Sequence, residues 1–178
     1  MWLSPVTDVE PAAEPLLKAA VKEYLRIDDA DDSFDGQLDD FITSSRAEVE
    51  TWTGTRLITQ TVTASADGWA AFQLLPVGPV QSVLSVKYID TLGVEQTVDP
   101  EDYELIGNGL SRSIIPVLGK HWPTAAIRID AVRVSLVVGY GTAGDALPSD
   151  VYFALQRLVR AKMDDRKLEL IDLLVNHR

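Results

Sequence analysis

The chain has 178 residues, 46% of them hydrophobic, and a net charge of −11, which predicts a folded, acidic protein long enough to bury a full core. The absence of cysteine excludes disulfides, thiolate metal sites and a cysteine nucleophile. The first residues lack the basic start and apolar core of a signal peptide, and no apolar run approaches the roughly 20 residues that cross a bilayer, so we expect an intracellularly made protein without a membrane partner.

The N-terminal part predicts an arm and a helix. Residues 1–11 are expected to be extended, because Pro5 and Pro11 break any helix. Residues 12–25 repeat apolar side chains at helical spacing and predict a first helix, with Pro15 in its first turn. The link to the next helical segment is short, so the two helices are expected to pack as an antiparallel hairpin.

Residues 33–54 carry the clearest helical pattern. Asp32 or Ser33 is expected to cap the start, and Gly54 lies where a helix usually stops. The apolar side chains recur at three- and four-residue steps, with small Ser45 on the same face, and predict a helix of about five turns. They are Phe34, Leu38, Phe41, Ile42, Val49 and Trp52.

From about Arg56 the pattern changes to short runs rich in Val, Ile, Thr and Tyr, divided by Gly and Pro. A hairpin loop is expected at residues 91–93. Without helical crossovers, the segment predicts an antiparallel β insertion of five to seven strands. The strands are expected near residues 57–64, 70–75, 82–89, 93–98, 102–106 and 126–138.

The C-terminal part returns to helix. Ser149 is expected to cap a helix with one apolar stripe, and residues 168–176 predict a short final helix with apolar residues on more than one face. That final helix either docks on a neighbouring subunit or folds back on its own core. The expected fold class is α+β in one domain, residues 1–178: an N-terminal arm and helical hairpin (1–54), an antiparallel β insertion (55–147) and two C-terminal helices (148–178).

Several short motifs, in this order, resemble the head-tail connector (adaptor) proteins of tailed bacteriophages, in the group with a β-rich insertion between the second and third helices. The motifs are LRIDDADD, the helix at 33–54, TGTRLITQTV, VSLVVGYG and LPSDV. The resemblance implies a structural subunit in the virion neck of a phage, prophage or gene-transfer particle, made in the bacterial host cytoplasm. It also implies a homo-oligomeric ring of about twelve copies beneath the portal protein, which extends the DNA channel and docks a tail or stopper protein.

The resemblance also implies where two surfaces lie. The terminal helical segment would grip the portal, with Leu170, Leu173 and Leu174 buried and Arg178 near an acidic partner. The DNA channel could be lined by acidic residues that could equally face outer solvent. These are Asp28, Asp29, Asp31, Asp32 and Asp35.

The charge distribution fits DNA that passes without specific binding. Residues 1–50 carry a net charge of −9, residues 51–145 carry −3 and residues 146–178 carry +1, with no cluster of Lys and Arg that would grip phosphates. An acidic wall repels DNA and prevents it from sticking. The alternative is that the charge only keeps the protein soluble.

No motif predicts catalysis, a cofactor or a metal. The glycines at 139–144 match G-x-G-x-x-G but lack the helix start that a dinucleotide needs, so a turn is expected. Residues 31–42 open like a calcium loop, but Ile42 replaces the twelfth-position carboxylate. His121 and His177 have no ligand or triad partners at recognisable spacing.

The remaining tryptophans leave alternatives open. Trp2, Trp69 and Trp122 are candidates for intersubunit contacts, or each covers the chain's own core. A pocket lined by Trp69, Tyr103 and Trp122 would instead favour a small-ligand or carbohydrate-binding β module. An enzyme with no recognisable motif is the third alternative.

Overall fold

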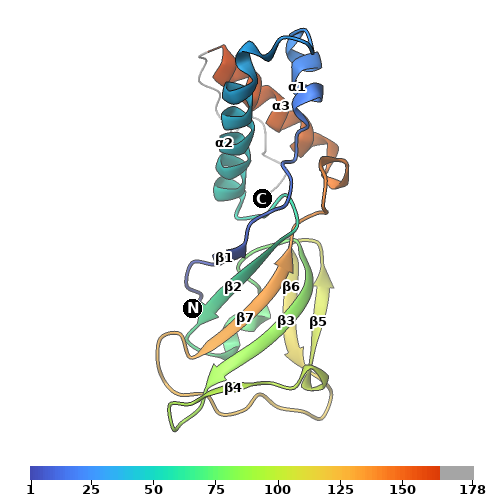
Figure 1. Ribbon diagram of the computed structural model, residues 1–178. Helices are drawn as coiled ribbons and strands as arrows, with labels where there is room; N and C mark the ends of the chain where they lie inside the picture. The colour runs from blue at the N-terminus through green and yellow to red at the C-terminus, as the bar shows by residue number, and fades with distance from the viewer. Residues whose placement is uncertain (165–178) are drawn as a thin grey trace. The chain divides into compact units, whose positions relative to one another are not determined.

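The computed structural model describes residues 1–164, which divide into two compact units. The β unit consists of residues 1–10 and 59–139, and the helical unit consists of residues 11–58 and the described chain from residue 140 (Figure 1). Residues 59–139 of the β unit lie in the sequence between the two segments of the helical unit. The N-terminal arm, which the sequence groups with the helix pair, belongs to the β unit.

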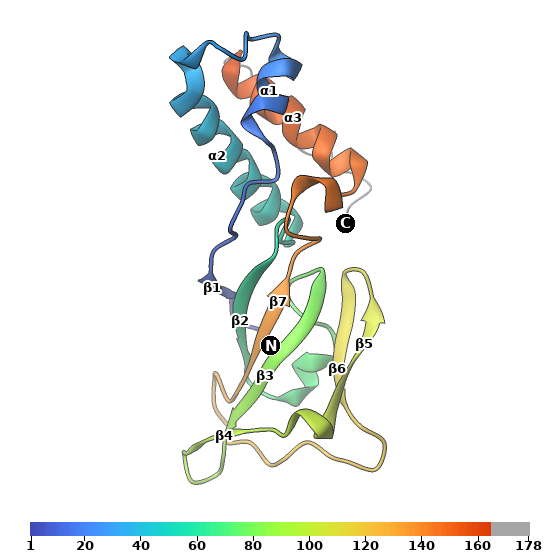
Figure 2. The same ribbon diagram turned by 45° about the vertical axis from the view of Figure 1, so that its right-hand side comes forward.

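The β unit is antiparallel throughout, as predicted. Its larger sheet has the order β1-β2-β7-β3-β4, and β5 and β6 form a separate hairpin (Figure 2). Of the seven strands in the described chain, six lie in the segment for which five to seven were predicted, and β1 lies in the N-terminal arm. The seven strands are β1 (Val6–Val9), β2 (Gln60–Ala66), β3 (Val80–Ile89), β4 (Glu95–Thr97), β5 (Tyr103–Asn108), β6 (Ser111–Pro116) and β7 (Val132–Val138).

Strict alternation in β2 and β7 creates one buried face of the larger sheet. Every second residue of each strand is buried, and Val62 lies opposite Leu136 in the antiparallel register. Ile114 of β6 joins the same core, so the hairpin packs on this sheet. The opposite face carries Thr63, Ser135 and other polar residues, which is the pattern of an antiparallel sheet with one solvated face.

Three predictions in the β unit were wrong in detail. The arm is not merely extended, because Val6–Val9 pair with β2 as strand β1. Residues 70–75 are not a strand, because Trp69–Gln73 form a 3₁₀ helix, whose period of three aligns Trp69 with Phe72. The last strand begins at Val132 rather than 126, because Asp130, at φ 64°, interrupts the extended backbone.

The helical unit packs α1 (Lys18–Leu25), α2 (Asp35–Thr53) and α3 (Ser149–Met163) around one apolar core. Two 3₁₀ turns, η1 (Asp32–Phe34) and η4 (Gly144–Ala146), precede α2 and α3. The predicted stripes are confirmed in part, since Phe34 is 39% exposed and lies in η1 rather than in the core. The core contains Val21 of α1, Leu38, Ile42 and Val49 of α2, and Val151, Leu155 and Leu158 of α3.

The helix starts differ from the predictions. The first helix begins at Lys18 rather than 12, because Pro15 disfavours a helical Glu14 and Leu17 remains extended. Neither Asp32 nor Ser33 caps the second helix, since Asp31 accepts the capping bond from the Ser33 amide at η1. Ser149 makes no capping bond and is itself the first residue of α3.

The helix end at Gly54 is confirmed. Gly54 adopts the left-handed conformation, with φ 70°, and its amide closes the last turn of α2 on the Glu50 carbonyl. The second predicted C-terminal helix, at residues 168–176, lies outside the described residues. Among residues 1–164, no helix is long and apolar enough to cross a membrane.

Candidate functional site

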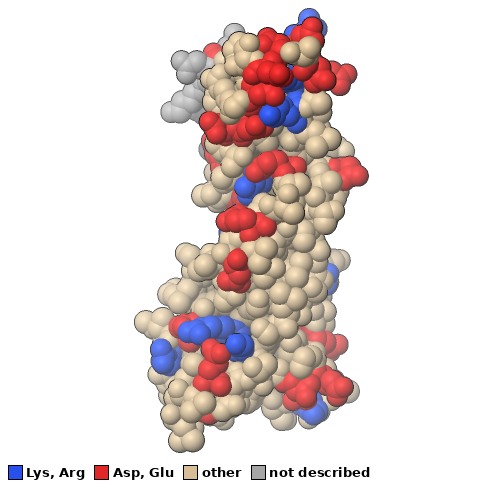
Figure 3. Space-filling model, viewed as in Figure 1, with Lys and Arg blue, Asp and Glu red and all other residues tan. Residues whose placement is uncertain are grey.

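The turn between α1 and α2 is the most acidic segment of the chain. Seven aspartates and no Lys or Arg occur between residues 28 and 40. Figure 3 shows acidic side chains gathered over this end of the helical unit. Of the five aspartates proposed to line a channel, Asp28, Asp29 and Asp32 are exposed, whereas Asp31 and Asp35 are partly buried. We call this segment the acidic turn.

Asp35 is held by two lysines of α1. Its carboxylate lies 2.6 Å from the Lys22 ammonium and 3.3 Å from that of Lys18. Lys18 also lies 2.8 Å from Asp39. These contacts pair the start of one helix with the later part of the other, so α1 and α2 run antiparallel, as the predicted hairpin requires. The Lys22 hydrogen bond lowers the pKa of Asp35 and raises the pKa of Lys22.

The buried side chain of Lys22 stabilises the acidic turn. This side chain is only 4% exposed, and its ammonium also donates to the Asp29 carbonyl at 3.1 Å. Asp31 shapes the same turn by accepting the Ser33 amide at 3.0 Å, and hydrogen bonds from Ser33 lower the pKa of Asp31. Asp28, Asp29 and Asp32 are exposed and present negative charge to solvent, although Asp28 also accepts the Ala30 amide at 3.0 Å and Asp32 lies 3.7 Å from the Lys22 ammonium.

A second ionic cluster lies where α2 ends. Glu50 is 8% exposed on its side chain, accepts the Leu57 amide at 2.8 Å and lies 3.3 Å from Arg46. Arg46 also donates to Glu14, at 2.8 Å from Nε. Burial raises the pKa of Glu50 despite these favourable contacts. The cluster fixes the chain that leads from α2 toward the β unit.

An apolar pocket of about 580 Å³ opens on the helical unit. It is formed by residues 13–17, the η4 turn and the first turn of α3. Leu17 and Phe153 on its wall are 74% and 52% exposed. Gly144 allows close packing here, because a Cβ at this position would lie 1.8 Å from the Pro15 carbonyl oxygen. The sequence analysis missed this pocket, and the only signal was the glycine at 144 within the turn.

The candidate aromatic residues pack against one another. Trp69 stacks on Trp122 with ring centroids 4.5 Å apart, and Trp2 stacks on Phe72 at 5.3 Å. The Trp2 indole donates to the Leu74 carbonyl at 2.8 Å, and the Trp69 indole to the Pro123 carbonyl at 2.8 Å. These contacts cover the core of the β unit, which is one of the two alternatives. Whether Trp2 also contacts another subunit stays a prediction.

The glycine motif at 139–144 is the expected strand-to-helix turn. Gly139, at φ 122°, follows β7, and Gly141 bridges to Ile58. The α3 helix begins at Ser149, after the glycine motif rather than at its third glycine. Ile42, at the twelfth position of the calcium-like loop, is buried in the helical core. Within residues 1–164, no group of three or more potential ligands could hold a metal ion.

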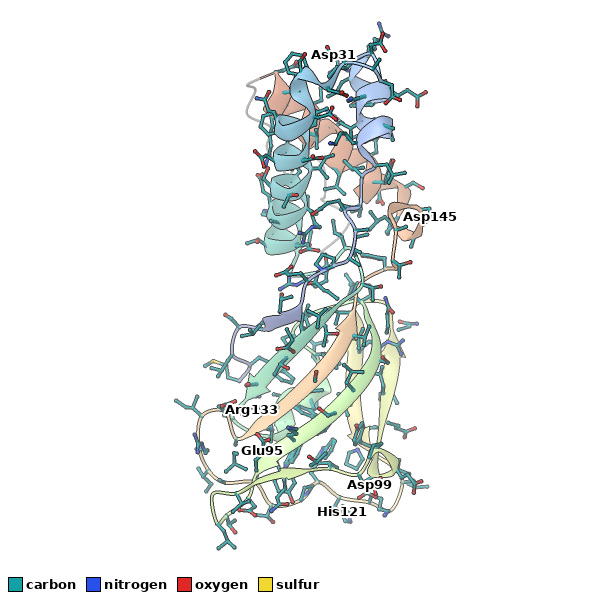
Figure 4. All side chains as sticks on the ribbon, viewed as in Figure 1. Asp31, Glu95, Asp99, His121, Arg133 and Asp145 are labelled. Carbon is teal, nitrogen blue, oxygen red and sulfur yellow. The ribbon has the colours of Figure 1, made fainter. Side chains whose placement is uncertain are left out.

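The other predicted sites are placed as follows. His121 is exposed in the loop that precedes β7, as Figure 4 shows. His177 and the proposed portal contacts, Leu170, Leu173, Leu174 and Arg178, lie outside the described residues. Those contacts therefore stay predictions.

The fold is similar to that of chains solved in gene transfer agent (GTA) particles. A chain from the neck of an empty GTA particle, computed with C6 symmetry, matches with a TM-score of 0.79 at 23% identity, covering 99% of this chain and 95% of that chain. A chain from the virion of a native GTA particle matches with the same TM-score, identity and coverages.

A chain from the neck of a native GTA particle, computed with C12 symmetry, matches with a TM-score of 0.69 at 22% identity, covering 96% and 94% of the two chains. No family model and no curated protein matches the chain. The likeness spans both units and shows that the protein has the fold of these particle chains.

Proposed function

We propose that this chain is a head-tail connector (adaptor) subunit in the neck of a phage-like particle. The observation that carries the proposal is the likeness to neck chains over 99% of this sequence at a TM-score of 0.79. The motif order in the sequence supports the same assignment independently. The role is structural rather than enzymatic, in keeping with the neck location of the matching chains.

The proposed assembly is a closed ring of about twelve copies beneath the portal. The C6 and C12 symmetries of the matching particle necks support this stoichiometry. In such a ring, one face of each subunit meets a different face of the next. The ring extends the DNA channel from the portal and presents a docking surface for the tail or a stopper protein.

The acidic turn suits the channel wall. Asp28, Asp29 and Asp32 are exposed, and a wall of like charge lets DNA pass without adhering. Asp31 and Asp35 support these residues through the capping bond and the lysine contacts.

The terminal helical segment is proposed to grip the portal. Its apolar residues exceed what one buried face of a helix needs, and they include Leu170, Leu173 and Leu174. Arg178 would then approach an acidic residue of the portal. Replacing these three leucines by serine is expected to abolish portal binding while rings still form on their own or with a cross-linker.

The small-ligand or carbohydrate-binding alternative has no comparable support. Trp69, Tyr103 and Trp122 would need to present free faces to a ligand. Trp69 and Trp122 instead stack on each other. The ring centroid of Tyr103 lies 6.4 Å from that of Trp122, and Tyr103 is only 9% exposed. The three aromatic rings therefore pack in or against the core of the β unit and do not present free faces to a ligand.

The test is electron microscopy of the purified chain, alone and mixed with the portal protein of the same particle. Rings stacked coaxially on the portal are the expected result. A chain that stays monomeric and ignores the portal at micromolar concentrations would contradict the proposal. Isothermal titration with a panel of sugars would then test the binding-module alternative.

A further inference from the structure

Two isoleucines project from the loop that precedes β7. Ile127 is fully exposed and Ile129 is 72% exposed. The loop that carries them is fixed at both ends to the last residue of β3. The Ala126 amide donates to the Ile89 carbonyl at 2.8 Å, and the Ile89 amide donates to the Ala131 carbonyl at 2.8 Å. We call residues 126–130 the isoleucine loop. It is an anchored apolar projection, which is costly in water unless a partner covers it.

The isoleucine loop carries a positive charge between its two apolar residues. Arg128 is exposed, its side chain donates a hydrogen bond to the neighbouring Ile129 carbonyl at 3.2 Å, and it forms no salt bridge within residues 1–164. Asp130, the nearest acidic residue in sequence, is held by Arg133. The loop therefore presents two aliphatic side chains and, between them, a guanidinium that is available to pair with a carboxylate of another molecule.

The apolar pocket of the helical unit offers the complementary chemistry. Its wall includes exposed Leu17 and Phe153, and Asp145 of η4 is an exposed carboxylate among its lining residues. Asp145, labelled in Figure 4, forms no salt bridge in the described part of the chain. The pocket has a volume of about 580 Å³, which accommodates several aliphatic side chains.

Within residues 1–164 neither feature is covered, since Ile127 and Phe153 are both exposed. We propose that the isoleucine loop of one copy docks in the apolar pocket of the next copy, with Arg128 paired to Asp145. This inference rests on the proposed ring, which needs two different, mutually complementary faces on every subunit. It supplies those faces: an apolar projection with a basic centre and an apolar pocket with an acidic rim.

The contact is tested by charge exchange in the full-length chain. Arg128→Asp and Asp145→Arg each place like charges together, and each is expected to raise the concentration for half-maximal ring assembly about tenfold or more. The double variant recreates the pair in reverse and is expected to recover most of the assembly. Mass photometry across a concentration series measures all three, on the portal template if the ring needs it.

A matched control separates the specific pair from net charge. Arg157 of α3 is exposed, so Arg157→Asp combined with Asp145→Arg has the same net charge as the double variant but does not recreate the pair. This combination is expected to assemble as poorly as Asp145→Arg alone. A second variant, Ile127→Ser with Ile129→Ser, removes the apolar part and is expected to weaken assembly without changing the charge.

The outcomes distinguish this contact from the proposed function. If the wild-type chain forms rings and the single variants form them equally well, the docking is overturned while the connector proposal stands. The same applies if the variants assemble normally but lose the tail or stopper protein, because the loop then faces that partner. If the wild-type chain forms no ring with or without the portal, the proposed function itself fails. Circular dichroism confirms that each variant is folded.

Discussion

The two units of the chain use charge in opposite ways. In the β unit, ion pairs such as Lys87–Glu95 and Arg133–Glu95 lie on the surface, where each partner is 39% to 44% exposed. In the helical unit, Lys22 and Glu50 are charged groups with side chains 4% and 8% exposed. Surface pairs contribute little, whereas breaking a buried charged contact is costly. The stability of the helical unit should therefore depend on charge, and that of the β unit on apolar packing.

The largest effect is expected from the aromatic core of the β unit. Phe72 is fully buried against Trp2, Trp69 and Trp122, so Phe72→Ala should lower the free energy of unfolding by about 3–5 kcal/mol. Denaturant titration followed by tryptophan fluorescence measures the change. Leu84→Ala is the control, because Leu84 is exposed on β3 and should change stability by less than about 0.5 kcal/mol. Equal effects would contradict the assignment of the core.

A smaller effect is expected at the end of α2. Glu50→Ala removes the acceptor for the buried Leu57 amide and should lower the free energy of unfolding by about 1–3 kcal/mol. Glu50→Gln keeps an amide oxygen for this bond and should cost less. Helix circular dichroism during urea unfolding compares the two. A glutamine variant as unstable as the alanine variant would show that the charge near Arg46, rather than the Leu57 bond, matters most.

The acid response tests the Lys22–Asp35 contact. The pKa of Asp35 is lowered by Lys22, so its stabilisation is present above the unfolded carboxyl pKa of about 3.9 and is lost as pH falls through the lower folded pKa. Asp35→Asn should therefore be less stable than the wild type at pH 7, and the difference should shrink below about pH 3.9. Thermal melting at a series of pH values measures this.

Acid affects the contribution of Glu50 to stability in the opposite direction to that of Asp35. Because burial raises the pKa of Glu50, protonation as pH falls through that raised value should favour the folded state. Glu50→Gln lacks this titrating carboxyl group, so comparing its acid response with that of the wild type isolates the contribution of Glu50. A difference in thermal stability between the wild type and Asp35→Asn that stays constant from pH 7 to pH 3 would contradict an ionic role for Asp35.

The smallest effect on stability is expected at the exposed aspartates. Asp28→Lys, Asp29→Lys and Asp32→Lys together should lower the free energy of unfolding by about 1 kcal/mol or less, because their side chains are exposed and the reversal removes only the Asp28 bond to the Ala30 amide and the 3.7 Å contact of Asp32 with Lys22. Assembled rings of this variant should nevertheless retain DNA, and salt should release it. Co-sedimentation of rings with DNA over a salt series measures retention. Unchanged retention would remove these residues from the channel wall.

The sequence predicted the elements whose pattern is local. The helix at 33–54 shows its face and its end within one segment, and the alternation in β7 shows which residues are buried. The 3₁₀ turn at Trp69–Gln73 was not predicted, because a short, largely apolar run fits a strand equally well. The start of α1 was predicted too early, because the helical spacing continues through Pro15 although the backbone does not.

The candidate site depends on contacts that a linear pattern does not reveal. The acidic turn is visible in the sequence, but the burial of Lys22 beneath it follows from how α1 packs on α2. The apolar pocket joins residues 13–17 to residues 143–153, and nothing in either segment alone indicates a cavity. Resemblance to connector proteins led to the proposed function, since composition and spacing alone indicated only an acidic structural or binding protein.

The central claim, that the chain joins head to tail, is tested most directly by particles produced without it. Electron microscopy of lysates from producing cells that lack this gene would count tailed and tailless heads. A connector role predicts heads without tails, and restoration of tailed particles when the gene is supplied in trans. A normal proportion of tailed particles in its absence would contradict the connector role.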